Sequence, residues 1–91
     1  MGYYRAAMAG GRLPKSLYSK RYSQFLTLMK RARIESGLTQ TDVATRLGRP
    51  QSFVSKCESG ERRVDVAEFL AYCRAIQVDP IAIIRVLIRT E

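Results

Sequence analysis

The feature that most constrains the fold is segment 38–60, where glycines interrupt helical sequence patterns at short intervals. Thr39, followed three residues later by an acidic residue, forms a pattern that is typical of a helix N-terminus. Gly48 would end this helix, because glycine adopts the left-handed backbone conformation at low cost. A second helix is expected from about Pro50 to Ser59, with Gly60 as its stop. The spacing predicts two short helices joined by a tight turn.

Another helix is expected before this pair, with Ser19 as its N-cap and its end near Ser36. Gly37 would stop it. Its apolar residues recur at helical spacing and predict a buried stripe formed by Tyr22, Phe25, Leu26 and Met29. If the stripe continues by four residues it reaches Arg33, which places a charged residue in a core position.

Two more helices are expected after the pair. Asp65 is the expected cap of the first of them, and the residues expected on its buried face are Val66, Phe69, Leu70 and Cys73. Asp79-Pro80 combines a cap with proline at the first helical position, which favours a last helix over residues 80–90. No strand pattern and no internal repeat is present. The expected fold class is therefore all-α, with five helices in one compact domain over residues 19–91.

Charge is unevenly distributed along the chain, whose net charge is +8. Residues 1–35 hold eight Lys and Arg residues and one acidic residue. Residues 64–91 hold three Lys and Arg residues and four acidic residues. This asymmetry suits a domain that binds a polyanion on one side, and a merely solubilising surface is the alternative. Residues 1–18 contain two adjacent glycines and a proline, and are expected to form a flexible basic N-terminal arm.

The composition argues against several classes of function. No run approaches the roughly 20 apolar residues of a membrane span, and the start of the chain lacks the apolar part of a secretory signal. With no histidine and only Cys57 and Cys73 as cysteines, neither a metal, a cofactor nor a disulfide framework is expected. No phosphate-binding glycine loop and no nucleophile beside a base is present, so a cytoplasmic protein without enzymatic activity is expected.

The segment from about Tyr22 to Val78 resembles the Cro and phage-repressor-like family of helix-turn-helix regulators, also called the XRE family. The resemblance rests on residues that fall in register: Thr39-Gln40, Ala44, Leu47-Gly48, Gln51-Ser52, Val54-Ser55 and Glu58-x-Gly60. It implies a lambda-repressor-like DNA-binding domain. One departure is Pro50, which stands where this family often has a serine or threonine cap. Arg49 is therefore the expected N-cap, with Pro50 as the first helical residue.

The resemblance implies that the second helix of the motif enters the major groove of double-stranded DNA. Glutamine can pair with adenine through two hydrogen bonds, and lysine can reach guanine. The expected base contacts are Gln51, Ser52, Ser55 and Lys56. The expected phosphate contacts are Thr39, Gln40, Arg49, Arg62 and Arg63. The alternative for Gln51, Ser52, Arg62 and Arg63 is a solvated side chain without a partner in DNA.

The resemblance also pairs Arg33 with Glu58 as a buried ion pair. Both residues fall on the inner stripes of their helices. An isolated charge in either place would be strongly destabilising, so each residue accounts for the other.

The last helix is apolar around most of its circumference, and only Arg85 and Arg89 mark a polar side. A second apolar face exposed on a monomer favours association, so a homodimer is expected. The expected interface residues are Ile81, Ile84, Leu87 and Ile88. The alternative is that the N-terminal arm covers this face.

The expected function is that of a transcriptional regulator, a repressor, which binds a palindromic operator with half-sites roughly 34 Å apart. The alternative is the antitoxin of a toxin–antitoxin module, which would also regulate its own operon and bind a toxin as its protein partner. That alternative is disfavoured because no long disordered tail for wrapping a toxin is evident. An RNA-binding or pure interaction module is a third possibility, but an aromatic platform is missing from the second helix of the motif.

Overall fold

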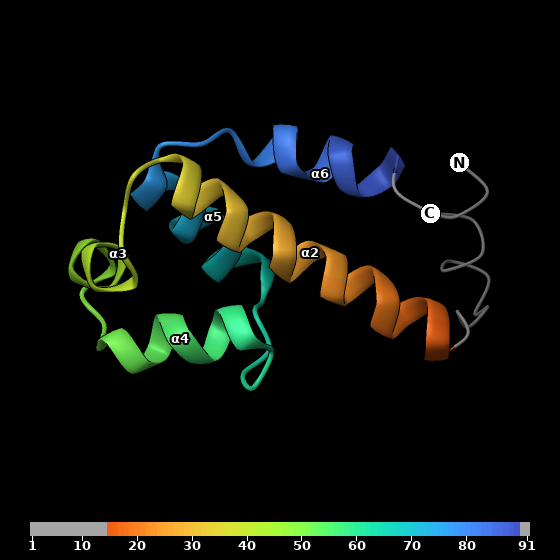
Figure 1. The fold of residues 1–91 in the computed structure, drawn as a ribbon, viewed down its shortest axis with the longest axis horizontal. Coiled ribbons are helices and arrows are strands. Elements are labelled where there is room, and N and C mark those ends of the chain that lie inside the picture. Colours follow the sequence, from red (N-terminus) through yellow and green to blue (C-terminus); the bar gives the residue numbers. More distant parts are fainter. Residues whose placement is uncertain (1–14, 90–91) are drawn as a thin grey trace.

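The computed structural model describes the backbone of residues 15–89 and the side chains of residues 20–89. The helices are α2 (Lys15–Glu35), α3 (Gln40–Leu47), α4 (Gln51–Ser59), α5 (Val66–Ile76) and α6 (Pro80–Arg89), as Figure 1 shows. Within the described residues there is no strand, so the predicted all-α class is confirmed. No helix in this part of the chain is long and apolar enough to cross a membrane.

The N-terminal boundary of the first helix differs from the prediction. Ser19 was expected as the N-cap, but α2 is already helical from Lys15. Serine is tolerated inside a helix at modest cost, so a cap-type residue does not by itself begin one. The predicted arm spans residues 1–18, and residues 1–14 of it lie outside the described part of the chain.

The turn between α3 and α4 has the expected glycine and an unexpected cap. Gly48 lies in the left-handed region at φ 67°, and the following amide of Arg49 donates to Ala44 O at 3.0 Å. The predicted N-cap of α4, Arg49, is wrong, because Pro50 has extended backbone and its carbonyl accepts the first helical hydrogen bond from Phe53 N. Gln51 is thus the first residue of α4, and no side chain caps this helix.

The core lies where α2, α3, α4 and α5 meet, and α6 closes it on the far side of α2 from α4 (Figure 1). The predicted stripe of α2 is confirmed, since Leu26 and Met29 are buried while Tyr22 and Phe25 pack against the core. Gly60 ends α4 at φ 84°, and an added Cβ would lie 3.1 Å from Leu26 Cδ1. This glycine therefore serves both the turn and the packing.

Two residues expected on the buried face of α5 are exposed. Val66 is 75% exposed and Leu70 is 48% exposed. The buried residues of α5 are Phe69, Tyr72, Cys73, Ala75 and Ile76. Leu70 falls outside this face by helical geometry, whereas Val66 shares the face but is the first residue of α5.

Candidate nucleic-acid interface

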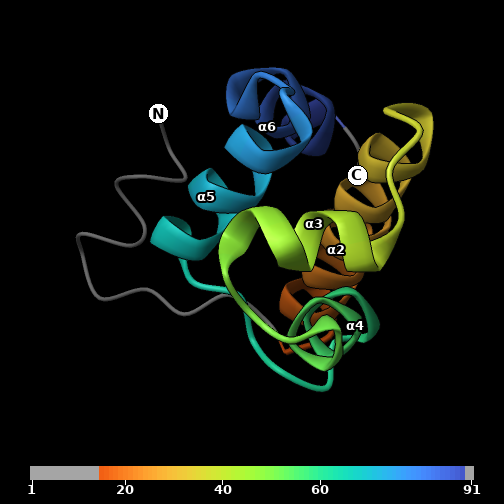
Figure 2. The same cartoon turned by 90° about the vertical axis from the view of Figure 1, so that its left-hand side faces the viewer.

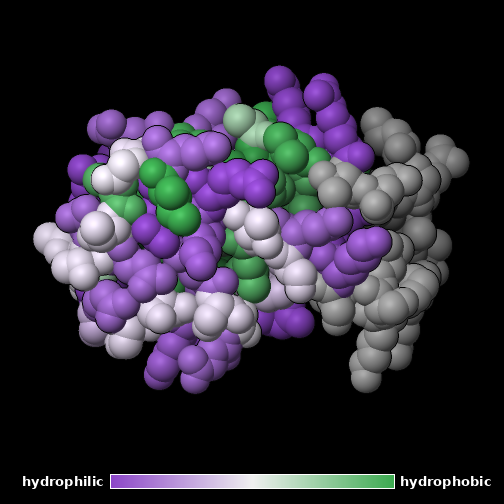
Figure 3. Space-filling view, viewed as in Figure 1, coloured by the Kyte–Doolittle hydropathy of each residue, from purple (hydrophilic) through white to green (hydrophobic). Residues whose placement is uncertain are grey.

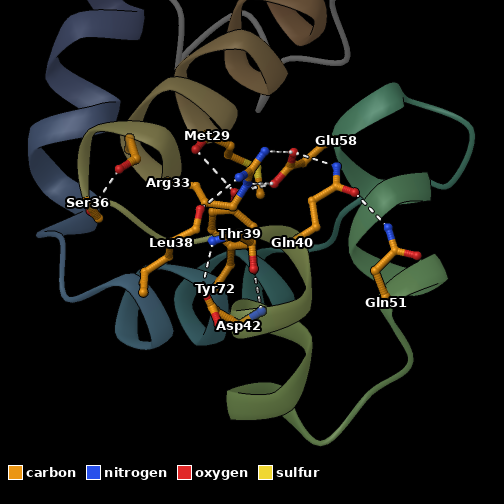
Figure 4. Close-up of polar contacts among 11 residues, drawn as sticks. Met29, Arg33, Ser36, Leu38, Thr39, Gln40, Asp42, Gln51, Glu58 and Tyr72 are labelled. Carbon is orange, nitrogen blue, oxygen red and sulfur yellow. Dashed lines mark hydrogen bonds and ion pairs between the residues drawn. The ribbon is translucent and has the colours of Figure 1, made fainter.

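The exposed side of α4 carries polar residues at its beginning. α3 lies crosswise to α4, and the start of α4 is close to the start of α3 (Figure 2, Figure 4). Of the four expected base contacts, three are exposed and Ser55 is half-buried; the exposed ones are Gln51, Ser52 and Lys56. The opposite side of the helix is buried through Val54, Cys57 and Glu58. α4 is therefore held by its inner face while its first turn faces solvent.

A buried ion pair lies directly behind this surface. Arg33 donates from Nε to Glu58 Oε2 at 2.7 Å and from Nη2 to Oε1 at 3.0 Å, a bidentate arrangement. The two side chains are only 9% and 2% exposed. Arg33 also donates to the carbonyl of Leu38 at 2.8 Å, which ties the turn before α3 to α2. This pair joins α2, α4 and the start of α3.

Glu58 has further donors besides Arg33. Tyr72 donates its hydroxyl to Glu58 Oε2 at 2.6 Å, and Gln40 donates from Nε2 to Oε1 at 3.1 Å (Figure 4). Burial alone would raise the pKa of Glu58, but the hydrogen bonds from Arg33, Tyr72 and Gln40 outweigh it and hold this pKa below its ordinary value. Glu58 is therefore ionised at neutral pH, with donors on both oxygens.

The two phosphate contacts expected at the start of α3 are already engaged within the protein. Thr39 accepts from Asp42 N at 3.0 Å, and its own amide donates to the Asp42 carboxylate at 2.8 Å, which completes a capping box. Gln40 donates to Glu58, and its Oε1 accepts from Gln51 Nε2 at 2.8 Å. Thr39 therefore stabilises the N-terminus of α3, and Gln40 holds the side chain of Gln51 in place.

The expected arginine contacts flank α4 on an aromatic support. The guanidinium carbons of Arg49 and Arg62 lie 4.6 and 4.8 Å from the ring centre of Phe53. Arg62 also forms an ion pair with Glu68 at 2.8 Å. The hydrogen bond from Arg62 is the main reason why the pKa of Glu68 lies below its ordinary value. Arg62 is thus partly neutralised, whereas Arg49 extends the cationic edge beside Gln51.

Arg63 lies over a second ring. Its guanidinium carbon is 4.5 Å from the ring centre of Tyr22, and the Tyr22 hydroxyl accepts from Val64 N at 2.9 Å. The loop between α4 and α5 is therefore fastened to α2 through Tyr22, with Arg63 on its outer side. A cation stacked on an aromatic ring keeps its charge and loses side-chain freedom.

Sequence reasoning missed the roles of Tyr72 and Phe53. Tyr72 lies one residue before Cys73 in the apolar pattern of α5. A buried tyrosine hydroxyl needs a hydrogen-bond partner, and this requirement could have indicated its role. Phe53 is half-buried and was not expected to hold two arginines. Nothing in the spacing of Arg49 and Arg62 indicates a common ring, because they come together only after α4 has formed.

The two cysteines have different surroundings, since Cys73 packs in the core cluster whereas Cys57 lies beside the Arg62 guanidinium. Cys57 and Cys73 are free and buried. Burial raises the pKa of the Cys57 thiol, and it raises the pKa of Cys73 to about 11. Both are therefore protonated fillers of the core at neutral pH. Among residues 15–89, no three His, Cys, Asp or Glu side chains are grouped so that they could hold a metal ion.

α6 carries an apolar face that the rest of the domain leaves open. Ile83 is buried, Ile84 and Leu87 are half-buried, and the side chains of Ile81 and Ile88 are 52% and 62% exposed. By helical geometry Ile81, Ile84 and Ile88 lie on one side of α6. Figure 3 shows hydrophobic atoms gathered over α6. We call Ile81, Ile84 and Ile88 the α6 face.

Comparisons with known proteins agree with this geometry. A family model of the helix-turn-helix domain matches residues 24–83. The structure of an XRE-family like protein from Pseudomonas syringae pv. tomato str. DC3000 is similar at 51% identity, over 80% of this chain and 89% of that chain, with a TM-score of 0.78. The restriction-modification controller protein C.AhdI from Aeromonas hydrophila is similar at 27% identity, over 66% of this chain and 91% of that chain, with a TM-score of 0.60.

A third similar structure shares the fold at lower identity. It is the tetramer of the restriction-modification controller protein C.Esp1396I in complex with its natural 35-base-pair operator. The identity is 22%, over 76% of this chain and 91% of that chain, with a TM-score of 0.68. Among curated proteins, none matches the sequence.

The five described helices and the matched domain define a helix-turn-helix DNA-binding regulator, in which α3 and α4 are the two helices of the motif. The chain belongs to the XRE family of these regulators. The resemblance noted in the sequence is thus confirmed.

Proposed function

We propose that this protein represses transcription by binding, as a homodimer, to a palindromic operator in double-stranded DNA. The observation that carries the proposal is the position of Gln51, which lies exposed at the first turn of α4 and is held there by Gln40. The similar protein C.Esp1396I binds its operator as a tetramer, which supports an oligomer on DNA as the functional form. A dimer seated on a promoter would block access to it.

The proposed base reader is the amide of Gln51. One hydrogen of its Nε2 is donated to Gln40 Oε1 at 2.8 Å, which leaves its own Oε1 and the second hydrogen on Nε2. This acceptor and donor match N6 and N7 of adenine in the major groove. Ser52, Ser55 and Lys56 are proposed to contact neighbouring base edges, with Ser55 contributing least because it is half-buried.

The proposed phosphate contacts surround this reader. Arg49 lies in the turn before α4, and Arg62 and Arg63 lie in the loop after it, so cations are present at both ends of the helix. Gln40 is proposed to contact a phosphate through its backbone amide at the start of α3, since its side chain is engaged within the protein. Thr39, whose amide and hydroxyl are both bonded to Asp42, is proposed to act by holding this helix N-terminus against the phosphate. These contacts would set the position of α4 in the groove without reading sequence.

Removal of the Gln51 amide is expected to relax the choice of base at one position. Selection from a random pool of duplexes, followed by sequencing, should yield one consensus for the wild type. In Gln51→Ala one base pair of that consensus should lose its preference for A·T, a loss of about 1–3 kcal/mol of discrimination. Arg49→Ala is the matched comparison and should weaken binding to all sequences alike. If both variants weaken binding to all duplexes equally, Gln51 does not read a base.

We further propose that the α6 face joins two copies of the chain. It combines two exposed isoleucines with the half-buried Ile84, and a two-fold arrangement would cover all three side chains in each copy. Leu87 lies at the edge of this face and would be covered with it. Two α4 helices placed one duplex turn apart, roughly 34 Å, would then face the same side of the DNA.

A charge on the α6 face is expected to separate the copies without unfolding them. Ile88→Glu should be monomeric by light scattering, and its affinity for the selected palindrome should fall by about a hundredfold, because the second half-site no longer acts with the first. Val86→Glu is the matched control, since Val86 is 47% exposed and points away from Ile88 around the helix. A wild type that is monomeric at all concentrations would contradict the proposed interface.

A further inference from the structure

Behind the proposed reader lies a hydrogen-bond chain that runs from the core to the surface. Tyr72 donates to Glu58, Gln40 donates to Glu58, and Gln51 donates to Gln40. The three distances are 2.6, 3.1 and 2.8 Å, and the chain can be followed in Figure 4. We call it the Tyr72–Gln51 chain. It connects α5, α4 and α3 to the first residue of α4.

The direction of every bond in this chain follows from its buried end. An ionised carboxylate can only accept hydrogen bonds, so Gln40 must turn its NH₂ group towards Glu58. The carbonyl oxygen of Gln40 then faces Gln51, and Gln51 must turn its own NH₂ group towards Gln40. A neutral partner in place of Glu58 would leave both amides free to rotate by half a turn.

The carboxylate itself is held in place by four bonds. Glu58 Oε2 accepts from Arg33 and Tyr72, while Oε1 accepts from Arg33 and Gln40. Because Tyr72 and Arg33 together fix Oε2, Oε1 stays directed at Gln40. No buried side-chain polar atom among the described residues lacks a hydrogen-bond partner, so every polar atom at the buried end of the Tyr72–Gln51 chain is already bonded.

We propose that Glu58 and Tyr72 are positioning residues that set the orientation in which the Gln51 amide faces DNA. This inference rests on the proposed function and extends it, because it assigns part of the base preference to side chains that do not touch DNA. With the chain intact, Gln51 keeps one N–H for Gln40 and presents one acceptor and one donor, which suits adenine. With the chain broken, both Nε2 hydrogens are free to point to N7 and O6 of guanine, so G·C becomes acceptable.

Two variants break the chain without removing the ion pair. Gln40→Met keeps the length of the side chain and removes both of its hydrogen bonds. Tyr72→Phe keeps the ring in the core and removes one donor to Glu58. Cys73→Ala serves as the matched control, since it removes buried volume from the neighbouring position of α5 and no bond of the chain.

The experiment compares these proteins on the duplex selected by the wild type and on its single-pair variants. At the base pair identified by Gln51→Ala, the wild type should prefer A·T over G·C about tenfold or more. Gln40→Met should reduce this preference about fivefold, and Tyr72→Phe about two- to threefold, with the loss directed towards G·C. Affinity for random duplex should be unchanged in Tyr72→Phe, and Cys73→Ala should keep the wild-type preference. Because Gln40 is itself a proposed phosphate contact, Gln40→Met is judged by the ratio of its affinities for the A·T and G·C duplexes.

The outcomes separate this inference from the proposed function. If the wild type selects a consensus and Gln51→Ala alters one pair, but Gln40→Met and Tyr72→Phe keep full preference, the Tyr72–Gln51 chain does not orient the reader while the proposed function stands. If Cys73→Ala loses the preference as well, general loosening of the core is the cause, and the inference is overturned. If the wild type selects no sequence at all, both proposals fail.

Discussion

Arg33→Met is expected to lower the free energy of unfolding by about 3–5 kcal/mol, because it leaves the carboxylate of Glu58 buried without its main partner. The effect is large because the side chain of Glu58 is only 2% exposed. The same substitution removes the hydrogen bond to Leu38 O at the start of the motif. Urea unfolding at pH 7, followed by circular dichroism, would measure the loss.

The double variant Arg33→Met, Glu58→Met tests whether the two charges act as a pair. With both charges removed, the loss should be smaller than the sum of the two single losses, since no charge is stranded. Additive losses would contradict the pairing. Tyr72 retains an acceptor in the double variant, because its hydroxyl also lies 3.2 Å from Met29 O.

Acid offers a second readout of the same pair. In the wild type the pKa of Glu58 is lowered by its partners, so its contribution to stability is present above the ordinary pKa of about 4.3 and is lost as the pH falls through the lower folded value. In Arg33→Met burial dominates, and protonation of Glu58 relieves the stranded charge. The difference in the free energy of unfolding between the wild type and Arg33→Met should therefore become smaller below about pH 5.

Affinity for the selected duplex is expected to fall about a thousandfold between about 50 and 200 mM salt, if roughly six phosphates are neutralised in the complex. The net charge of +8 and the cations on both sides of α4 are the reason for this expectation. Each lysine or arginine that contacts a phosphate releases a condensed counterion from DNA. Fluorescence anisotropy at several salt concentrations gives the slope directly.

Single arginines should contribute to this slope according to their place in the fold. Arg49→Ala should reduce the slope by about one, since one counterion fewer is released. Arg89→Ala is the control, because Arg89 is exposed on α6, about 100° around the helix from Ile88, and Figure 1 places α6 and α4 on opposite sides of α2. Equal effects of the two substitutions would indicate that net charge alone, and not the surface around α4, governs binding.

Much of the fold follows from local sequence signals. The glycines at 37, 48 and 60 all have positive φ, and the predicted caps Thr39 and Asp65 both form capping boxes. Such signals are readable because they depend on a few neighbouring residues. The start of α2 and the cap of α4 were predicted wrongly, since serine and proline are each compatible with more than one position at a helix end.

The site was only partly predictable for a different reason. Exposed polar residues at the start of α4 follow from helical periodicity, as does the pairing of Arg33 with Glu58 once the family pattern is seen. The further donors to Glu58 come from α3 and α5, and their meeting depends on how three helices pack. The exposure of Val66 shows the same limit, because the helical pattern places it on the buried face of α5 although the packed domain leaves it 75% exposed.

Phe53 connects the two flanks of α4 in a way that bears on the thermodynamics of binding. Arg49 precedes the helix and Arg62 follows it, yet both guanidinium groups rest on this one ring. Immobilising a long side chain at an interface typically costs about 0.5–1.5 kcal/mol of conformational entropy. Here much of that ordering is already present in the free protein. An anion therefore binds these arginines on a preorganised surface.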